Sequence, residues 1–468
     1  MNISKTIKKQ VVVIGGGVAG CAAALAAARN GADTLLIESS GVLGGQAGLG
    51  IVTPLDSRFT LSGESFGGIL KEISAGVCML SEKYCTNDPD EGDHWQISAP
   101  HIVKYFLLKL LSDAGVEIRF HSTLCDTVKE GKEIKKITVL EKSGFTEIFA
   151  EVFIDASGDG DLLALSGCDF SLGSENGVYD TLKENDLDIR HNSEERYQGA
   201  VGVMQPVSIF FTMGGVDYER ASALNNKHLR FGDYGITRER FENWSFANTC
   251  GFELSDDDSI PMPQGRVLVS RGTKSDVAVI NMSRVVGING ADSDSLNEGE
   301  IKAQLQLIAI VDFLQTFIPG FEKSYLIQSG ATLGIRETRR LRGKYLLSGG
   351  EVISCKLFDD AVARGSYIID LHDPKGKSSA IGGSIKGDFY EIPYGSLVTD
   401  EAENLLVCGR CISVDHIAHA STRIQGTCIL TGQAAGTASA ISVKSKTAPS
   451  LLDGTEVRKL LKEQGVNI

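Results

Sequence analysis

The stretch that decides the fold is VVVIGGGVAGCAAALAAARNGADTLLIE, residues 11–38. It begins with an apolar, β-branched run, continues through a glycine cluster into an alanine-rich stretch, and closes with a second apolar run that ends in Glu38. β-Branched runs favour strands and alanine favours helices. This order therefore predicts a strand, a helix and a second strand, the βαβ unit of a parallel sheet.

The glycine cluster has the spacing of a nucleotide-binding turn. Gly15, Gly17 and Gly20 form G-x-G-x-x-G directly between the first strand and the helix. The first glycine permits a tight turn, the second lets the backbone approach a pyrophosphate, and the third lets helix and strand pack closely. Glu38 follows Gly20 by 18 residues, where a carboxylate accepts hydrogen bonds from ribose hydroxyls. The motif predicts a dinucleotide site but does not by itself separate NAD from FAD.

The composition excludes several classes of protein. Lys and Arg number 46 against 60 Asp and Glu, which gives a formal net charge of −14. Nucleic acid and anionic membranes attract basic surfaces, so we expect neither as a partner. No apolar stretch reaches the roughly 18 residues that a membrane span needs. The ten cysteines lack the spacing of a disulfide framework, which predicts reduced thiols and a cytoplasmic protein.

Hydrophobic periodicity predicts further elements after the first unit. Residues 98–115 predict a helix with Ser98 as its N-cap, because apolar residues recur every three or four positions and a glycine ends the pattern. Residues 426–443 predict a helix with small residues on several faces, which suits close packing. Between these helices we expect an antiparallel meander of strands at residues 116–128, 132–141 and 145–157.

The middle of the chain differs in character. Residues 176–248 are polar and irregular, and we interpret them as the start of a second domain. Residues 298–320 nevertheless predict a clear helix, with Ile301, Leu305, Ile308 and, one turn further, Val311 on one face.

Several further segments carry a family resemblance. They are the Gly44–Gly45 pair, DASGDG at 155–160, GIRETRR at 334–340, SYIIDLHDP at 366–374, IPYGSL at 392–397, LLVCGR at 405–410, and the GRCIS, STRIQ and GQAAG series between 409 and 436. On these segments the chain resembles the FAD-dependent oxidoreductases of the glutathione reductase structural class, in a poorly characterised branch. The resemblance covers both ends and much of the second half of the chain.

The resemblance implies an α/β fold with a Rossmann-like FAD-binding domain that is split in sequence by an inserted α+β substrate or cap domain. We expect the first part of the FAD domain at 1–180, the insertion at 181–384 and the C-terminal part at 385–468. FAD is expected to bind noncovalently, because Gln46 and Ala47 occupy the positions where a flavin-linking histidine would stand.

The same resemblance assigns cofactor contacts. The adenosine end of FAD is expected on the G-x-G-x-x-G turn and on Glu38. Gly44 and Gly45 are expected near the diphosphate or isoalloxazine. Ala156 and Gly158 are expected on the adenine and ribose side.

At the C-terminal end, Gly409 and Arg410 are expected near the ribityl and diphosphate groups. The helix that starts near Gln425 and Gly426 is expected to direct its amides at the flavin pyrimidine edge, where a helix dipole stabilises reduced flavin.

Four residues are candidates for the chemistry. His416 and His419, in DHIAHAST, lie in a segment that the resemblance places near the flavin, and they are expected to manage a proton. Arg423 and Arg336 are expected to hold the oxygen atoms of an anionic substrate. Structural histidines, and salt bridges for Arg336 and Arg339, remain open alternatives. The H-x-x-H pair lacks further ligands for zinc, so we expect no metal.

Other residues have weaker context. Cys408 and Cys411 form C-x-x-C, for which we favour buried small residues over a redox pair. Tyr394 is either a hydrogen-bond donor near the flavin or a core aromatic. His94, His121 and His191 lie in no recognisable motif.

Together these features predict an FAD-dependent oxidoreductase that transfers a hydride between flavin N5 and a small polar, anionic substrate. The alternatives left open are a flavin monooxygenase and a noncatalytic FAD-binding redox sensor, while the acidic charge argues against a tRNA-modification subunit. A disulfide reductase is disfavoured, because no C-x4-C follows the Gly44–Gly45 pair. The electron donor or acceptor is unassigned, and a homo-oligomer remains an option.

Overall fold

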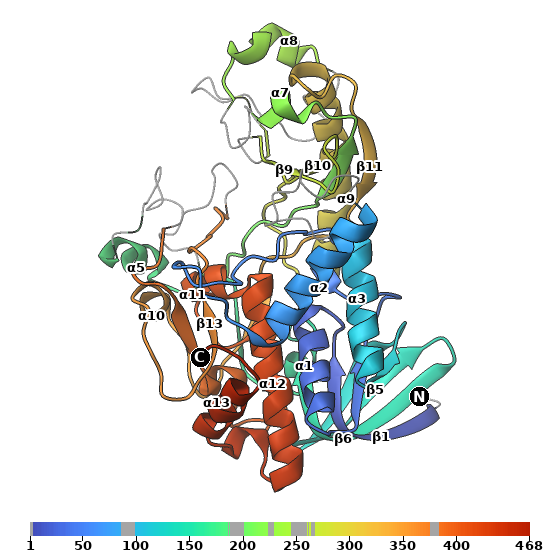
Figure 1. Ribbon diagram of the computed structural model, residues 1–468, viewed down its shortest axis with the longest axis vertical. Coiled ribbons are helices and arrows are strands. Elements are labelled where there is room, and N and C mark those ends of the chain that lie inside the picture. Colours follow the sequence, from blue (N-terminus) through green and yellow to red (C-terminus); the bar gives the residue numbers. More distant parts are fainter. Residues whose placement is uncertain are drawn as a thin grey trace.

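The computed structural model describes residues 3–85, 99–185, 187, 201–222, 229–244, 260, 262–263, 267–374 and 383–468. In Figure 1, the large sheet and the helices around it form one end of the molecule, and a smaller helix-and-sheet unit forms the other. The two ends of the chain lie in the larger part.

The large sheet has seven strands in the order β3-β2-β1-β6-β5-β4, with β15 paired to β6. Its parallel members are β1 (Ile3–Ile14), β2 (Thr34–Ile37), β3 (Glu117–Arg119), β6 (Gly144–Asp155) and β15 (Leu405–Val407). β4 (Thr123–Glu130) and β5 (Glu133–Glu141) complete it as an antiparallel meander with β6. The register places Ile14 and Val407 on either side of Asp155, so three strands end together at one edge of the sheet.

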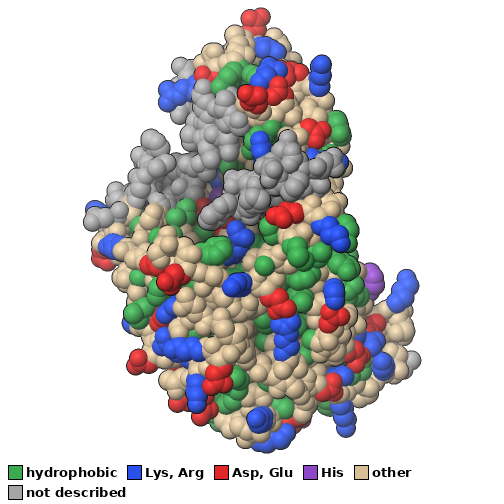
Figure 2. Space-filling view, in the orientation of Figure 1, with side chains coloured by type: hydrophobic (Ala, Val, Ile, Leu, Met, Phe, Trp, Pro, Cys, Tyr) green, Lys and Arg blue, Asp and Glu red, His purple; other side chains and the backbone are tan. Residues whose placement is uncertain are grey.

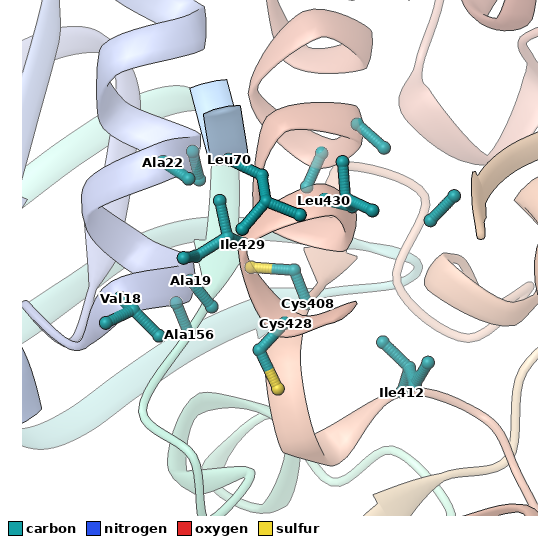
Figure 3. Packing of buried hydrophobic residues seen from close by; sticks show 14 of the residues in the cluster. Val18, Ala19, Ala22, Leu70, Ala156, Cys408, Ile412, Cys428, Ile429 and Leu430 are labelled. Carbon is teal, nitrogen blue, oxygen red and sulfur yellow. The ribbon is translucent and has the colours of Figure 1, made fainter. Parts of the chain in front are cut away.

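Two helices of small residues pack face to face beside this sheet. They are α1 (Val18–Arg29) and α12 (Gln425–Ser445). A Cβ atom on Gly432 or Gly436 would lie 2.1 Å from a carbonyl oxygen of α1, that of Ala19 or Ala23. Glycine is therefore required for this approach. Figure 3 shows the apolar side chains of both helices meeting next to Cys408.

Further helices pack around α1 and α12, and the last of them, α13 (Gly454–Glu463), lies near the C-terminal end of the chain. α2 (Gly68–Cys85) and α3 (Pro100–Asp113) lie beside α1, and α13 packs on α12. The short elements are α4 (Asp161–Leu165), β7 (Phe170–Leu172), α5 (Val178–Glu184), α7 (Tyr218–Ser222), α8 (Arg238–Glu242), β12 (Arg339–Leu341), α10 (Gly349–Ile353), β13 (Ala361–Gly365), β14 (Tyr390–Pro393) and α11 (His416–Thr422).

The smaller unit is built on a four-stranded antiparallel sheet of order β11-β8-β10-β9. Its elements are β8 (Phe211–Gly214), β9 (Val269–Arg271), β10 (Ala278–Ile280), β11 (Tyr325–Ser329) and the long helix α9 (Ser293–Phe317). Buried residues between 207 and 333 form a hydrophobic core of their own. Hydrophobic residues between 347 and 371 instead belong to the core around α1 and α12.

The predicted α/β class and parallel sheet are confirmed. The predicted helix at 98–115 is α3, whose N-cap residue is Ala99, while Ser98 lies outside the described residues. The run at 116–128 is not one strand. It turns at His121, whose φ is +52°, so that β3 joins the parallel strands and only β4 joins the meander.

The helix predicted at 298–320 is α9, and its buried face differs from the predicted one. Ile301, Leu305 and Ile308 are 55%, 57% and 49% exposed, whereas Leu307 and Ile310 are buried. Two apolar stripes share this helix, and only packing decides which one enters the core. The domain boundaries after residues 180 and 384 stay a prediction.

Candidate functional site

The glycine-rich turn between β1 and α1 needs glycine at two positions for reasons internal to the protein. Gly15 has φ +100°, and a Cβ there would lie 2.5 Å from the Ala156 carbonyl oxygen. A Cβ on Gly20 would lie 1.8 Å from the Gly15 carbonyl oxygen. These two glycines therefore allow β1, α1 and the end of β6 to approach one another.

Gly17 is different, because no protein atom requires it. Its φ is −66°, which any residue adopts, and a Cβ there would have no neighbour within 4 Å. Gly17 is also the N-cap of α1, with no side chain bound to the first amides of the helix. An open face at a helix N-terminus in a G-x-G-x-x-G turn is what a bound phosphate requires.

The acidic end of β2 lies against this turn. The Glu38 carboxylate accepts hydrogen bonds from the backbone amides of Gly16 at 2.7 Å and Ser40 at 2.6 Å. The Gly44–Gly45 pair closes the other side, since the Gly44 amide donates to the Gly16 carbonyl at 2.8 Å. The structure thus brings both glycine segments and the carboxylate to one place.

The C-terminal part of the chain adds a cation to the same edge of the sheet. Arg410 follows β15, and its Nη2 donates to Asp159 Oδ1 at 2.5 Å. A Cβ on Gly158 would lie 3.3 Å from that Nη2, and one on Gly409 would lie 2.9 Å from Ala19 Cβ. The other terminal nitrogen, Nη1, is buried and has no hydrogen-bond partner in the described structure. A buried guanidinium nitrogen with free N–H bonds fits a phosphate or hydroxyl of a cofactor.

The start of α12 lies against residues 52–57. Gln425 Nε2 donates to the Val52 carbonyl at 2.8 Å, and the Gly426 amide donates to the Asp56 carbonyl at 3.2 Å. Gln425 Oε1 is buried without a hydrogen-bond partner. Because the Gly426 amide already has a protein acceptor, its predicted contact with the flavin pyrimidine edge stays a prediction.

The two candidate histidines share one face of α11. His416 Nδ1 lies 2.8 Å from Glu337 Oε1, and both side chains are buried. Glu337 also forms an ion pair with Arg340. Burial by itself raises the pKa of Glu337, but the charges of His416 and Arg340 outweigh it and hold that pKa well below its usual range. Glu337 is therefore a carboxylate that orients His416.

His419 has a different environment. Its ring is fully buried, and neither Nδ1 nor Nε2 has a hydrogen-bond partner in the described structure. Burial lowers its pKa well below the usual value; Glu337 opposes this, and the charges of Arg340 and Arg423 reinforce it. A neutral imidazole with two unused nitrogens is unusual in a protein interior and marks a functional candidate.

Arg336 is buried and Arg423 is partly buried, and their hydrogen-bond partners differ. Arg423 Nη2 donates to Asp370 at 2.9 Å from Oδ2 and 3.0 Å from the carbonyl oxygen. Arg336 Nη1 donates only to neutral oxygens in the described structure, the Pro206 carbonyl at 2.6 Å and Ser208 Oγ at 2.7 Å. Burial, together with the charge of Arg423, lowers the pKa of Arg336 to about 9.

A hydrogen-bonded chain extends from Arg423 into the smaller unit. Asp370 Oδ2 lies 3.2 Å from His372 Nε2, and His372 Nδ1 lies 2.8 Å from Arg284 Nη2. Since a guanidinium only donates, Nδ1 accepts and Nε2–H donates to Asp370. Burial and the charge of Arg336 lower the pKa of His372 to about 3, which keeps this ring neutral.

The sequence analysis missed Asp370, Arg284 and Glu337 as members of this group. Asp370 and Glu337 lie in two segments that carry the resemblance, SYIIDLHDP and GIRETRR, so their position there was an available signal. Arg284 lies in no motif, and only the folded chain brings it to the group.

Other candidates are explained by packing. Arg339 donates to the Asp159 carbonyl and to Asp161 Oδ1, both at 3.0 Å, which fits the salt-bridge interpretation. The Tyr394 hydroxyl donates to the Pro449 carbonyl at 2.8 Å inside the core.

Cys408 and Cys411 are free and fully buried, and burial raises the pKa of each thiol well above the usual value. His121 is exposed, while His94 and His191 lie outside the described residues.

Two further observations concern metal ligands and membrane spans in the part of the chain that is described. No group of three or more His, Cys, Asp and Glu side chains there could hold a metal ion, and none of the helices described has the length and apolarity of a membrane span. Figure 2 shows acidic and basic side chains interspersed over the visible face.

We call the glycine-rich turn of residues 15–20, the Gly44–Gly45 pair, Glu38 and Arg410 the glycine cradle. A parallel sheet with this cradle at its carboxyl edge, and with the N-terminus of α1 open toward it, defines a dinucleotide-binding protein. A model of the FAD dependent oxidoreductase family matches residues 10–461. The chain belongs to this family, and FAD is its cofactor. A search of curated proteins found no match.

Among solved structures, the chain is similar to a geranylgeranyl bacteriochlorophyll reductase-like protein from Thermoplasma acidophilum, at 15% identity and TM-score 0.42, with 98% of this chain and 84% of that chain covered. It is also similar to p-nitrophenol 4-monooxygenase from Pseudomonas putida DLL-E4, at 11% identity and TM-score 0.43, with 98% and 86% covered. At such scores these similarities carry no argument about activity.

Proposed function

We propose that the protein transfers a hydride between flavin N5 and a small polar, anionic substrate, as a dehydrogenase or reductase. The observation that carries this proposal is the charge of Arg336. This guanidinium is buried and has only neutral acceptors among the described residues. The Asp370 carboxylate, whose charge also acts on Arg336, is already hydrogen-bonded to Arg423 and His372, so one carboxylate serves two cations. A buried cation that is incompletely compensated costs free energy. A carboxylate bound between Arg336 and Arg423 would remove that cost.

The cofactor contacts are proposed as the sequence assigns them, with FAD bound noncovalently. The G-x-G-x-x-G turn and Glu38 would hold the adenosine diphosphate, with Gly44, Gly45, Ala156 and Gly158 around them. When bound, FAD supplies the two-electron chemistry at its N5 atom.

Gly409 and Arg410 would complete the cradle from the C-terminal part of the chain. The free Nη1 of Arg410 supports a contact with the diphosphate or ribityl group. Gln425 and Gly426 remain proposed contacts at the start of α12.

His419 would hold the proton that accompanies the hydride, because both of its ring nitrogens lack other partners. Its low pKa arises partly from nearby arginines, Arg423 among them. A bound anion opposes those charges, so substrate binding would itself make His419 a stronger base. His416, held by Glu337, would orient or relay the same proton.

The location and partners are proposed on simpler grounds. Every cysteine that the structure describes is free, which supports a reducing, cytoplasmic setting. We propose a small-molecule substrate and an unassigned electron donor or acceptor, with a homo-oligomer as an option.

The test is anaerobic bleaching of the flavin at about 450 nm by a library of hydroxy acids, polyols, amines and enoates. We expect an acid to reduce the flavin, and Arg336→Leu to raise the substrate concentration required by at least about 100-fold. Arg339→Leu is the matched control, since this neighbouring arginine has acidic and carbonyl partners of its own. Reduction by an uncharged alcohol with no effect of Arg336→Leu would contradict the proposal. Hydroxylation coupled to rapid NAD(P)H oxidation would favour a monooxygenase.

A further inference from the structure

The segment that leads into β8 contains a buried amide with an unused donor. Gln205 is 1% exposed, and its Nε2 has no hydrogen-bond partner in the described structure. Buried amide groups in native proteins are almost always paired, so an unpaired one requires an explanation.

The orientation of this amide is fixed by the backbone around it. The backbone N–H of His372 donates to Gln205 Oε1 at 3.3 Å, and the backbone N–H of Gln205 itself donates to Glu337 Oε2, also at 3.3 Å. Exchanging Oε1 and Nε2 would place two donors opposite each other at His372, so the assignment shown is the favourable one. Both N–H bonds of Nε2 are therefore left for another molecule.

The neighbouring residue on the chain holds the proposed carboxylate-binding arginine. The Pro206 carbonyl accepts from Arg336 Nη1 at 2.6 Å. Arg336 is thus hydrogen-bonded to the residue that follows Gln205, and the hydrogen bonds from Gln205 Oε1 through His372 and Asp370 to Arg423 connect the amide to the second arginine. Donors placed together match acceptor atoms placed together in a ligand.

We propose that Gln205 Nε2 binds a second oxygen atom of the substrate, beside the carboxylate held by Arg336, so that the protein selects acids with an oxo or hydroxyl oxygen next to the carboxylate. This rests on the proposed function. The substrate class is then the 2-oxo and 2-hydroxy acids.

The same chemistry predicts which acids are rejected. A plain carboxylic acid leaves Nε2 unpaired, as it is in the free protein. A 2-amino acid carries an ammonium group, which offers no acceptor to Nε2 and is repelled by the arginines.

The first experiment uses the unmodified FAD-loaded protein. The probes are propionate, lactate, pyruvate and L-alanine, together with the larger set phenylacetate, mandelate, phenylglyoxylate and phenylglycine. Binding is measured by the rise in unfolding temperature and by the change in the flavin spectrum. In at least one set we expect the oxo and hydroxy acids to bind about tenfold or more tightly than the plain acid, and the amino acid not to bind.

The second experiment removes the donor. Gln205→Met has a similar shape without the amide, and it should reduce the preference for the oxo and hydroxy acids to about that for the plain acid while plain-acid affinity is kept. Gln433→Met is the matched control, because this buried glutamine has protein partners at both ends, the Ile69 amide and Gln464. It should leave the selectivity unchanged.

The possible results distinguish the claim that the substrate is an anion from the claim that Gln205 binds its second oxygen atom. If no acid binds, the anionic substrate of the proposed function is wrong, and the role of Gln205 fails with it. If acids bind and Arg336→Leu abolishes binding, but oxo, hydroxy and plain acids bind equally, only the role of Gln205 is overturned. Unchanged selectivity in a folded, FAD-loaded Gln205→Met protein would overturn it as well.

Discussion

The glycine cradle and the arginine group, which consists of Arg336, Arg423, Asp370, His372 and Arg284, bind ligands with different parts of the chain. The cradle presents backbone amides and close backbone contacts, and its first half comes from residues 15–45. The arginine group uses charged side chains, drawn from positions as distant as Arg284, Asp370 and Arg423. Backbone recognition of a phosphate needs only a local turn, whereas a buried charged site needs several segments to compensate one another.

The largest effects are expected for two glycines of the cradle, one of which is needed for folding and the other only for binding FAD. Gly20→Leu should lose both the folded state and FAD, because its side chain would overlap the Gly15 carbonyl oxygen. Gly17→Ala should fold normally, because its Cβ meets no protein atom, yet bind FAD at least about tenfold more weakly. Thermal unfolding of the apoprotein and an FAD titration measure the two effects. Normal FAD affinity in Gly17→Ala would show that no phosphate lies against this face.

The second prediction concerns the arginine group and its neighbouring imidazole. His419→Ala should retain FAD and slow substrate-dependent flavin reduction by roughly 10² to 10⁴-fold, the range for lost acid–base catalysis. Stopped-flow absorbance under anaerobic conditions gives the rate. His121→Ala, which changes an exposed ring, serves as the control. Unchanged rates in both His419→Ala and His416→Ala would leave the pair a structural role.

The third prediction uses pH to distinguish the side-chain site from the backbone cradle. An anion binds to the protonated form of Arg336, whose pKa is lowered to about 9 by burial and by Arg423. The cation is complete below this pKa and is lost as the pH rises through it. Anion affinity should therefore be level near neutral pH and fall by up to about tenfold per pH unit above about 9. Titrations of the anion at several pH values measure this. Equal affinity at about pH 7 and about pH 10.5 would contradict it.

The smallest effect is expected at the cysteines that border the cradle. Cys408 and Cys411 are fully buried with raised thiol pKa values, so alkylation of the native protein should leave them unmodified. The partly exposed thiols of Cys78, Cys85, Cys125 and Cys355 should react before them. Mass spectrometry after iodoacetamide treatment of native and unfolded protein gives the comparison. Rapid native modification of Cys408 would revive the redox-pair interpretation.

The sequence predicted the helices and strands well, but it did not predict which face of a helix is buried or which neighbour a strand pairs with. The helix α9 was predicted from its periodicity, yet its exposed stripe of Ile301, Leu305 and Ile308 could not be distinguished from the buried one. Both stripes are apolar, and only contact with the antiparallel sheet determines which is buried. The strand run at 116–128 likewise gave no sign of the turn at His121, where the chain passes from a parallel to an antiparallel neighbour.

By itself the sequence determined the βαβ unit, the glycine turn and Glu38, because their physics depends on residues within about 30 positions of one another. It also placed His416, His419, Arg336 and Arg423 as candidates. Only the tertiary structure decided that Arg336 hydrogen-bonds no carboxylate among the described residues while Arg339 is paired, and that Gln205 has a free donor. Whether a polar group is satisfied depends on every segment folded around it, and local sequence does not contain that information.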